Sequence, residues 1–302
     1  MPDRRCRLFH VDTFTRTRFQ GNPASVVLDA DVLSDEEMQI IARELGSPET
    51  VFVLEAESSD HDLRLRFFTP RHEVPFVAHA TIAAHYVRAK HDGASTGALR
   101  QATGAGVAGI EVFEAEGDLR VAIELSPPSL GPVIPDHHRT QVLDAIGVSS
   151  PSLHKRCPLQ ILAKGSTRLM IGVRSREQLA QVKPDFDRLA KLTPHVGAEG
   201  YFVFALDESA VPLATESRMF VPAIGIPEDP VSGNAHGMLG TYLVTHGLIE
   251  TADGVARFHG TQGRFVGRPG SLDVEIESSG RVVQSVRVIG DAVIVYEAEL
   301  PL

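Results

Sequence analysis

The chain has 302 residues, of which 43% are hydrophobic and 23% charged, and its formal net charge is −10 at pH 7. This length and composition favour a globular protein of two domains, and the negative charge argues against nucleic acid or an anionic membrane surface as its main partner. No stretch approaches 18 consecutive apolar residues, so we expect no membrane span and a cytoplasmic location. The two cysteines, Cys6 and Cys157, have no ligand spacing and no sign of a disulfide framework.

The first half of the chain alternates strand and helix patterns. Strands are expected at 6–14 and 24–28, on either side of the turn Gly21-Asn22-Pro23. Ser34 and Glu37 form a capping-box pattern that begins a helix, and Gly46 ends it. Apolar runs and alternation predict the remaining elements, which are strands at 51–54, 62–68, 107–114 and 119–125 and a buried helix at 77–89.

The second half repeats this order. Its expected elements are strands at 169–171, 201–203 and 215–221, a helix beginning after Ser175, a Gly- and Ala-rich helix at 234–246, and strands at 272–276, 281–289 and 292–297. Residues 49–53 align with 199–203 at a shift of 150, and residues 66–70 align with 218–222 at a shift of 152. We infer an old duplication that produced two pseudo-symmetric domains.

The domain boundaries follow from this repeat. The N-terminal half is predicted to span 1–126 and the C-terminal half 127–286, with the last strands, 287–302, returning to the first half. The proline-rich stretch 126–139 is predicted to be the junction. We expect the active site in the cleft between the two halves.

The segment 225–237 carries the strongest chemical signal, since it is a turn-rich loop that enters a helix. Gly233 allows close approach of a ligand, and free N–H groups at the helix start suit a carboxylate or phosphate. Asp229, just ahead of that helix, is either a site residue or a helix-capping acid.

The corresponding segment of the first half, 75–80, also feeds a helix start, at which His79 is either a site residue or a buried structural histidine. Two such helix starts facing one cavity would suit a small acid. Glu49 precedes an apolar strand, where partial desolvation suits a carboxylate to proton transfer, although a surface glutamate is the plainer interpretation. Glu199 stands at the position related by the shift of 150 and could be a second acid or base.

Two other patterns are set aside. Gly104-Ala-Gly106-Val-Ala-Gly109 matches a dinucleotide-binding fingerprint, but a strand and not a helix follows it. His79 and His85 lie six residues apart, on different faces of a helix, so no metal site is expected.

Several short motifs are spread from end to end of the chain. They are Val11-Asp-Thr-Phe14, Gly21-Asn22-Pro23, Ile41–Leu45 followed by Glu49, Phe68-Thr-Pro70, Glu73-Val-Pro-Phe76, His79, Arg218-Met-Phe220, Gly225–Val231, Gly233, Gln262-Gly263 and Gly267-Arg-Pro269. Together they resemble the PhzF family of phenazine-biosynthesis isomerase-like proteins, which shares the fold of diaminopimelate epimerase. The resemblance implies an α+β fold of two pseudo-symmetric domains, each a curled sheet around a central helix, and often a homodimer.

The resemblance also implies roles for site residues. Glu49 would be the general acid and base that moves a proton between carbons of a small unsaturated acid, supported by His79 and Asp229. The residues that would bind this small anionic substrate are Asn22, Ala78, Gly233 and Asn234. No metal or organic cofactor would be needed. Ala78, Ala80 and Asn234 replace the family's usual Gly, Pro and Ser, which puts the particular substrate in doubt.

Three functions are compared. The first is an isomerase acting through the single carboxylate of Glu49. The second, a cofactor-independent epimerase or racemase of the related fold, uses two cysteines at the helix starts, whereas this chain has Ala78-His79 and Gly233-Asn234 there. The third is a non-catalytic protein that binds a small acid.

Overall fold

The computed structural model describes residues 4–93 and 96–302. The chain divides into two compact units, one formed by Met1–Leu125 with Ile289–Leu302 and the other by Ser126–Val288. No helix in the described ranges is long and apolar enough to cross a membrane.

The strands of the N-terminal unit form a sheet that closes on itself. They are β1 (Arg5–Thr13), β2 (Asn22–Leu28), β3 (Thr50–Glu55), β4 (Leu63–Phe68), the short β5 (Glu73–Val74), β6 (Gly97–Thr103), β7 (Gly106–Ala115), β8 (Asp118–Leu125) and the end of β17 (Val282–Pro301). Pairing runs from β1 through β2, β3, β4, β6, β7 and β8 to β17, which pairs again with β1. The β2–β3 and β4–β6 pairs are parallel.

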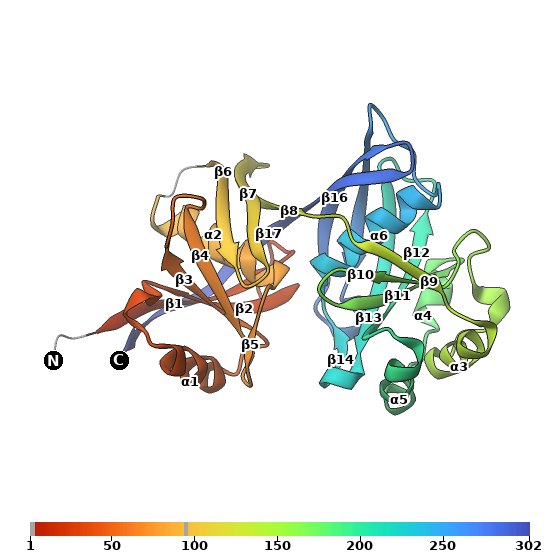
Figure 1. Cartoon of the computed structure of the whole chain (residues 1–302), viewed down its shortest axis with the longest axis horizontal. Coiled ribbons are helices and arrows are strands. Elements are labelled where there is room, and N and C mark those ends of the chain that lie inside the picture. The colour runs from red at the N-terminus through yellow and green to blue at the C-terminus, as the bar shows by residue number, and fades with distance from the viewer. Residues whose placement is uncertain (1–3, 94–95) are drawn as a thin grey trace. The chain divides into compact units, whose positions relative to one another are not determined.

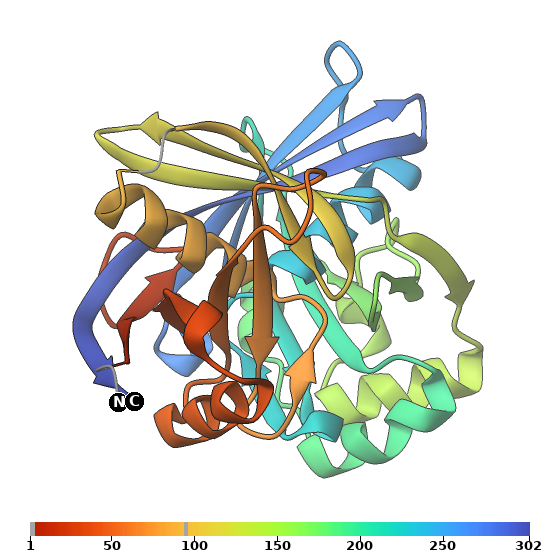
Figure 2. The ribbon, with the colours of Figure 1, turned by 60° about the vertical axis from the view of Figure 1, so that its left-hand side comes forward.

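Helix α2 (Ala78–His91) is the centre of this unit. Its first ten residues, 78–87, are all buried, and the ribbon shows the strands surrounding it (Figures 1 and 2). Small residues allow this, because alanine lets a helix be approached closely on most sides. The predicted arrangement of a curled sheet around a central helix is confirmed here.

Helix α1 (Asp35–Leu45) covers the outside of the same sheet. Ser34 accepts from the Glu37 N–H at 3.3 Å, and the Glu37 carboxylate accepts from the Ser34 N–H at 2.8 Å, so the predicted capping box is present. Gly46 ends the helix at φ 63, a left-handed conformation that glycine adopts without strain. Met38 and Ile41 pack into a cluster on the strands' outer face.

The C-terminal unit has the same plan. Its strands are β9 (Ser129–Val133), β10 (Gln160–Ala163), β11 (Thr167–Val173), β12 (Gly200–Asp207), β13 (Leu213–Val221), β14 (Ile226–Asp229), β15 (Val255–Gln262), β16 (Gly270–Ser279) and the first part of β17. Its helices are α3 (Asp136–Ile146), α4 (Arg176–Ala180), α5 (Phe186–Val196) and α6 (Gly233–Thr245). α6 is the buried central helix. A Cβ at Gly240 would lie 2.8 Å from Ile276 Cγ1, so the glycine is what lets α6 pack closely on β16.

The order of strand pairings repeats between the units. The parallel pairs β2–β3 and β4–β6 of the first unit correspond to the parallel pairs β11–β12 and β13–β15 of the second. The antiparallel pairs β3–β4 and β12–β13 also correspond, and in each unit the central helix follows a short strand, β5 or β14. This topology supports the duplication inferred from the sequence.

Some expected elements differ from the structure. The segment 126–139 is no bare junction, because β9 lies within it and α3 begins at Asp136. The two strands expected at 281–289 and 292–297 are one continuous strand, β17. Helices α3 and α5 and strands β5, β6, β9, β10, β14 and β15 had no expected counterpart.

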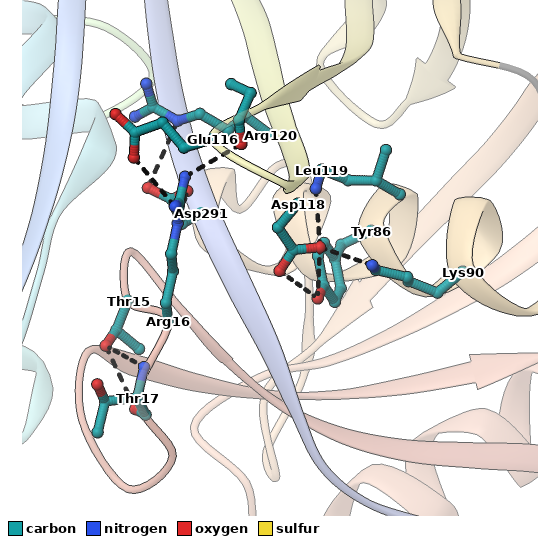
Figure 3. Close-up of polar contacts among 11 residues, drawn as sticks. Thr15, Arg16, Thr17, Tyr86, Lys90, Glu116, Asp118, Leu119, Arg120 and Asp291 are labelled. Atoms are coloured by element: carbon teal, nitrogen blue, oxygen red, sulfur yellow. Dashed lines mark hydrogen bonds and ion pairs between the residues drawn. The ribbon is translucent and has the colours of Figure 1, made fainter.

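The C-terminal part of β17 is joined to the N-terminal unit by polar contacts at Asp291. Its carboxylate lies 2.8 Å from Arg16 Nε and 3.4 Å from Arg120 Nε (Figure 3). Its carbonyl accepts from the Phe14 N–H at 2.7 Å. Arg16 also pairs with Glu116 at 3.0 Å. The last strand is therefore held by side chains from both ends of the unit's own sequence.

Candidate functional site

Glu49 and His79 lie together in the N-terminal unit. The Glu49 Oε2 atom is 3.1 Å from His79 Nε2, and the two side chains are 17% and 10% exposed. Glu49 directly precedes β3, and its carbonyl accepts from the Ser25 N–H at 3.1 Å, which fixes the backbone there. The structure thus brings two of the predicted site residues into contact.

His79 is the second residue of α2, whose first turn has no side-chain cap. Val77 stands at the N-cap and offers no side-chain oxygen to the first N–H groups. The positive end of the helix favours a nearby anion. Ala78, the first residue of the helix, is buried beside it. Asn22, the remaining predicted residue of this unit, begins β2 and is 3% exposed.

The other predicted residues lie together in the C-terminal unit. Asp229 ends β14, where it pairs with Met219 of β13, and α6 begins four residues later at Gly233. Ser232 is the N-cap of α6 and accepts from the Ala235 N–H at 3.3 Å. Asn234 directs its amide toward the β10–β11 turn, with Nδ2 3.5 Å from the Lys164 carbonyl.

The loop that carries Asp229 is fixed by a buried ion pair. Arg218 donates two hydrogen bonds to the Glu228 carboxylate, at 2.9 and 2.8 Å, and both side chains are less than 10% exposed. The guanidinium also donates to the Val182 carbonyl at 2.7 Å and lies 5.0 Å from the Phe220 ring and 4.4 Å from the Phe265 ring. A buried ion pair adds little net stability but restricts a loop to one geometry.

The N-terminal unit has the matching pair. Arg66 donates to both oxygens of Glu73 at 2.8 Å, and its guanidinium lies 5.2 Å from the Phe68 ring. Arg66 and Arg218 therefore occupy equivalent positions, as the shift of 152 predicts. These ion pairs were not among the predicted site features, although the repeated Arg-x-Phe pattern was their visible signal in the sequence.

The strand register corrects the alignment of residues 49–53 with 199–203 at a shift of 150. Thr50 of β3 pairs with Phe68, and in the second unit Tyr201 of β12 pairs with Phe220, the equivalent of Phe68. Thr50 is thus equivalent to Tyr201, a shift of 151 and not 150. Glu49 then corresponds to Gly200, and Glu199 is not its equivalent.

Gly200 has no room for a side chain. A Cβ there would lie 2.7 Å from Met219 Cε, 2.8 Å from Val221 Cγ1 and 2.9 Å from Arg168 Cδ. Glu199 instead lies on the surface, 56% exposed, and accepts from the Thr167 N–H at 3.0 Å. A carboxylate could stand in the C-terminal unit at the position of Glu49 only if these three side chains moved.

The two helix starts also correspond residue by residue. Val77 and Ser232 are the N-caps, so Ala78 is equivalent to Gly233 and His79 to Asn234. The same shift of 155 equates Glu73 with Glu228 and Val74 with Asp229, in agreement with the pairings Phe67–Val74 and Met219–Asp229. Pro75 then corresponds to Pro230 and not to Pro227, although Pro227 follows Pro222 by five residues as Pro75 follows Pro70. The titratable candidates Glu49, His79 and Asp229 thus each have a non-titratable residue at the equivalent position of the other unit.

Arg168 is a further buried cation of the C-terminal unit that was not among the predicted site residues. Its side chain is 14% exposed, and its Nη1 donates to the Thr167 carbonyl at 2.8 Å. Burial lowers the pKa of the Arg168 guanidinium, and the charges of Glu199 and Asp229 oppose that shift. Within residues 4–93 and 96–302, no group of three or more His, Cys, Asp or Glu could hold a metal ion.

Comparison with known proteins places the chain in a family. The model of the phenazine biosynthesis-like proteins, PhzC-PhzF, matches residues 11–298. An isomerase of Clostridium acetobutylicum is 38% identical over 299 residues, which cover 99% of each chain. The trans-2,3-dihydro-3-hydroxyanthranilate isomerase of Pseudomonas chlororaphis is 30% identical over 288 residues, which cover 94% of this chain and 95% of the relative.

Solved structures agree with this result. A PhzF-family phenazine biosynthesis protein of Bacillus anthracis superposes with a TM-score of 0.86 at 27% identity, covering 99% of this chain and 100% of the other. A hydroxyproline epimerase of Agrobacterium vitis superposes with a TM-score of 0.67 at 11% identity, covering 99% of this chain and 93% of the other, which shows a shared fold alone. The chain belongs to the PhzC-PhzF family of phenazine biosynthesis-like proteins.

Proposed function

We propose that this protein is a cofactor-independent isomerase that moves a proton between carbons of a small unsaturated carboxylic acid. Glu49 is the proposed general acid and base. The observation that carries this proposal is the 3.1 Å approach of Glu49 Oε2 to His79 Nε2, at the uncapped start of a buried helix. The names of the curated relatives, which are isomerases, agree with it.

The proposed reaction needs one carboxylate. Glu49 takes a proton from an allylic carbon, the electron pair of that C–H bond shifts the double bond by one position, and the same carboxyl group returns the proton to the far carbon. The anionic charge that develops is stabilised by N–H groups at a helix start, which are already oriented before the reaction.

The asymmetry between the units favours this reaction over racemisation. A two-base racemase needs a proton-transferring group for each face of the carbon. The position equivalent to Glu49 is Gly200, and the position equivalent to His79 is Asn234, neither of which exchanges protons near neutral pH. We therefore propose a single proton carrier, Glu49.

The remaining residues have supporting roles in this proposal. His79 orients the Glu49 carboxylate, and Asp229 supports proton transfer. Asn22 and Asn234 and the backbone at Ala78 and Gly233 bind the substrate. The substrate class includes trans-2,3-dihydro-3-hydroxyanthranilate, the compound in the name of the Pseudomonas relative.

The test is a panel of small unsaturated and β-hydroxy carboxylic acids, including trans-2,3-dihydro-3-hydroxyanthranilate. Each acid is assayed for thermal stabilisation of the protein and for incorporation of deuterium from heavy water. Isomerisation with deuterium incorporation supports the proposal. Acids that stabilise the wild-type protein but never exchange a proton would instead indicate a non-catalytic binding protein.

A further inference from the structure

We propose that Gln262 is a positioning residue that holds Asp229 in place. The inference rests on the proposed function, because Asp229 is assigned a part in proton transfer there. Gln262 ends β15 and is 3% exposed.

The Gln262 amide spans the segment between the acid and the helix. Its Nε2 donates to the Asp229 carbonyl at 2.7 Å, and its Oε1 accepts from the Ser232 N–H at 3.2 Å. One side chain therefore fixes both Asp229 and the N-cap of α6. A buried amide held at both ends leaves its partners little freedom, since any movement would leave buried polar groups unsatisfied.

The next residue packs the backbone against the same segment. Gly263 has φ 90, and a Cβ there would lie 2.8 Å from the Pro230 carbonyl oxygen and 2.1 Å from the Arg268 carbonyl oxygen. Only glycine fits this approach.

The equivalent position in the N-terminal unit carries a different residue. Arg64 pairs with Ala102 on β6, and Glu216, its equivalent at the shift of 152, pairs with Thr261 on β15. Thr103 is thus equivalent to Gln262, and Gly104 to Gly263. The close approach repeats as well, since a Cβ at Gly104 would lie 2.9 Å from Pro75 Cα.

Thr103 makes no such anchor. In the described part of the chain its hydroxyl bonds only within its own turn, to the Gly106 carbonyl at 3.0 Å and the Ala105 N–H at 3.1 Å. The segment it adjoins carries Val74 where the other unit carries Asp229. The glycine, Gly104 or Gly263, is present in both units and serves the fold. The Gln262 amide, by contrast, occurs only in the unit that carries Asp229. This co-occurrence assigns Gln262 to the placement of Asp229.

The experiment uses the full chain with Gln262→Met, which keeps the side-chain length and removes both hydrogen bonds. Its matched control is Gln160→Met in the same unit. Gln160 is also a buried amide, which donates to the Gly131 carbonyl at 2.8 Å and lies 2.7 Å from His246 Nε2. The two variants remove comparable bonds, so both are expected to lower Tm by a similar few degrees.

The deciding readout is the carbon-13 resonance of the Asp229 carboxyl group in protein labelled at aspartate, assigned by its loss in Asp229→Asn. Gln262→Met is expected to move this resonance by more than any shift in Gln160→Met. With trans-2,3-dihydro-3-hydroxyanthranilate or another acid that exchanges, kcat is expected to fall at least tenfold while KM stays within threefold. Gln262→Glu retains the acceptor for Ser232 but loses the donor to Asp229, so it should show the same fall in kcat while it keeps the bond at the helix N-cap. It also serves if the methionine variant does not fold.

An Asp229 resonance that is unchanged in Gln262→Met would overturn the inference and leave Gln262 as a residue of the fold alone. If only Gln262→Glu folds, an unchanged kcat would overturn it in the same way. The failure of the proposed function looks different. If Asp229→Asn exchanges deuterium as fast as wild type, then Asp229 has no part in proton transfer, while the resonance still decides whether Gln262 positions it.

Discussion

Glu49 and Gly200 occupy equivalent positions in the two units, one residue before the strand pairs β3–β4 and β12–β13. The duplication has kept the strand order and the Arg–Glu ion pairs of the loops, but it has not kept the titratable groups. His79 and Asn234 differ in the same way at the helix starts. A symmetric scaffold therefore carries an asymmetric set of chemical groups.

Glu49→Gln should abolish solvent-deuterium exchange into a true substrate and reduce kcat by at least a hundredfold. The amide keeps the shape of the side chain but cannot accept the proton at neutral pH. Thermal stabilisation by the same acid should persist, since the helix-start N–H groups are unaltered. Exchange at the wild-type rate would show that Glu49 is not the acid and base.

Gly200→Ala should lower stability, whereas Glu199→Gln should leave both stability and activity unchanged. The alanine Cβ would contact Met219 Cε at 2.7 Å, so the free energy of unfolding is expected to fall by about 1–3 kcal/mol. Glu199→Gln changes a 56%-exposed side chain and should alter neither stability beyond about 0.5 kcal/mol nor the exchange rate. Urea titration and deuterium exchange measure both variants, and a catalytic loss in Glu199→Gln would contradict the register-based equivalence.

His79→Ala and Asp229→Asn should lower turnover more than they lower stability. His79 contacts Glu49, and its removal leaves the carboxylate without that neighbour, so kcat should fall by about ten- to a hundredfold. Asp229 is partly exposed and its backbone is held by Gln262, so the loop should persist in the asparagine variant. Comparison of Tm with kcat separates the two effects, and collapse of the fold in either variant would favour a purely structural residue.

Local patterns in the sequence sufficed for most of the architecture. The capping box at Ser34 and Glu37 and the buried small-residue helix at 77–89 are both present, because they depend on neighbours in the chain. Helix α5 escaped prediction since Pro194 lies within its last turn, where a proline usually signals the end of a helix.

The strand register could not be predicted by aligning the two halves of the sequence. Glu49 and Glu199 both precede an apolar run, and an alignment by identity matches them. The pairing of Tyr201 with Phe220 shifts that match by one residue. A shift of one residue along a strand exchanges its two faces, so similarity in sequence could not show which glutamate has room and partners for chemistry.

The stability of the fold should fall as the pH decreases from about 6.5 to about 4, because two histidines are buried in neutral form. Burial lowers the pKa of His85 to about 4 and that of His236 to about 4. Between these values and the ordinary pKa near 6.5 the unfolded chain binds more protons than the folded chain, so unfolding becomes easier as protons are added.

The expected loss between pH 7 and pH 5 is roughly 2 kcal/mol for each of these histidines. Urea unfolding at the two pH values measures it, and His85→Gln is the informative variant. His85 Nε2 lies 2.6 Å from Gln101 Oε1, and a glutamine amide can replace that hydrogen bond without titrating. The variant should therefore lose less stability than wild type on acidification. An equal loss in both proteins would show that His85 is charged in the folded state, or that other groups dominate the acid response.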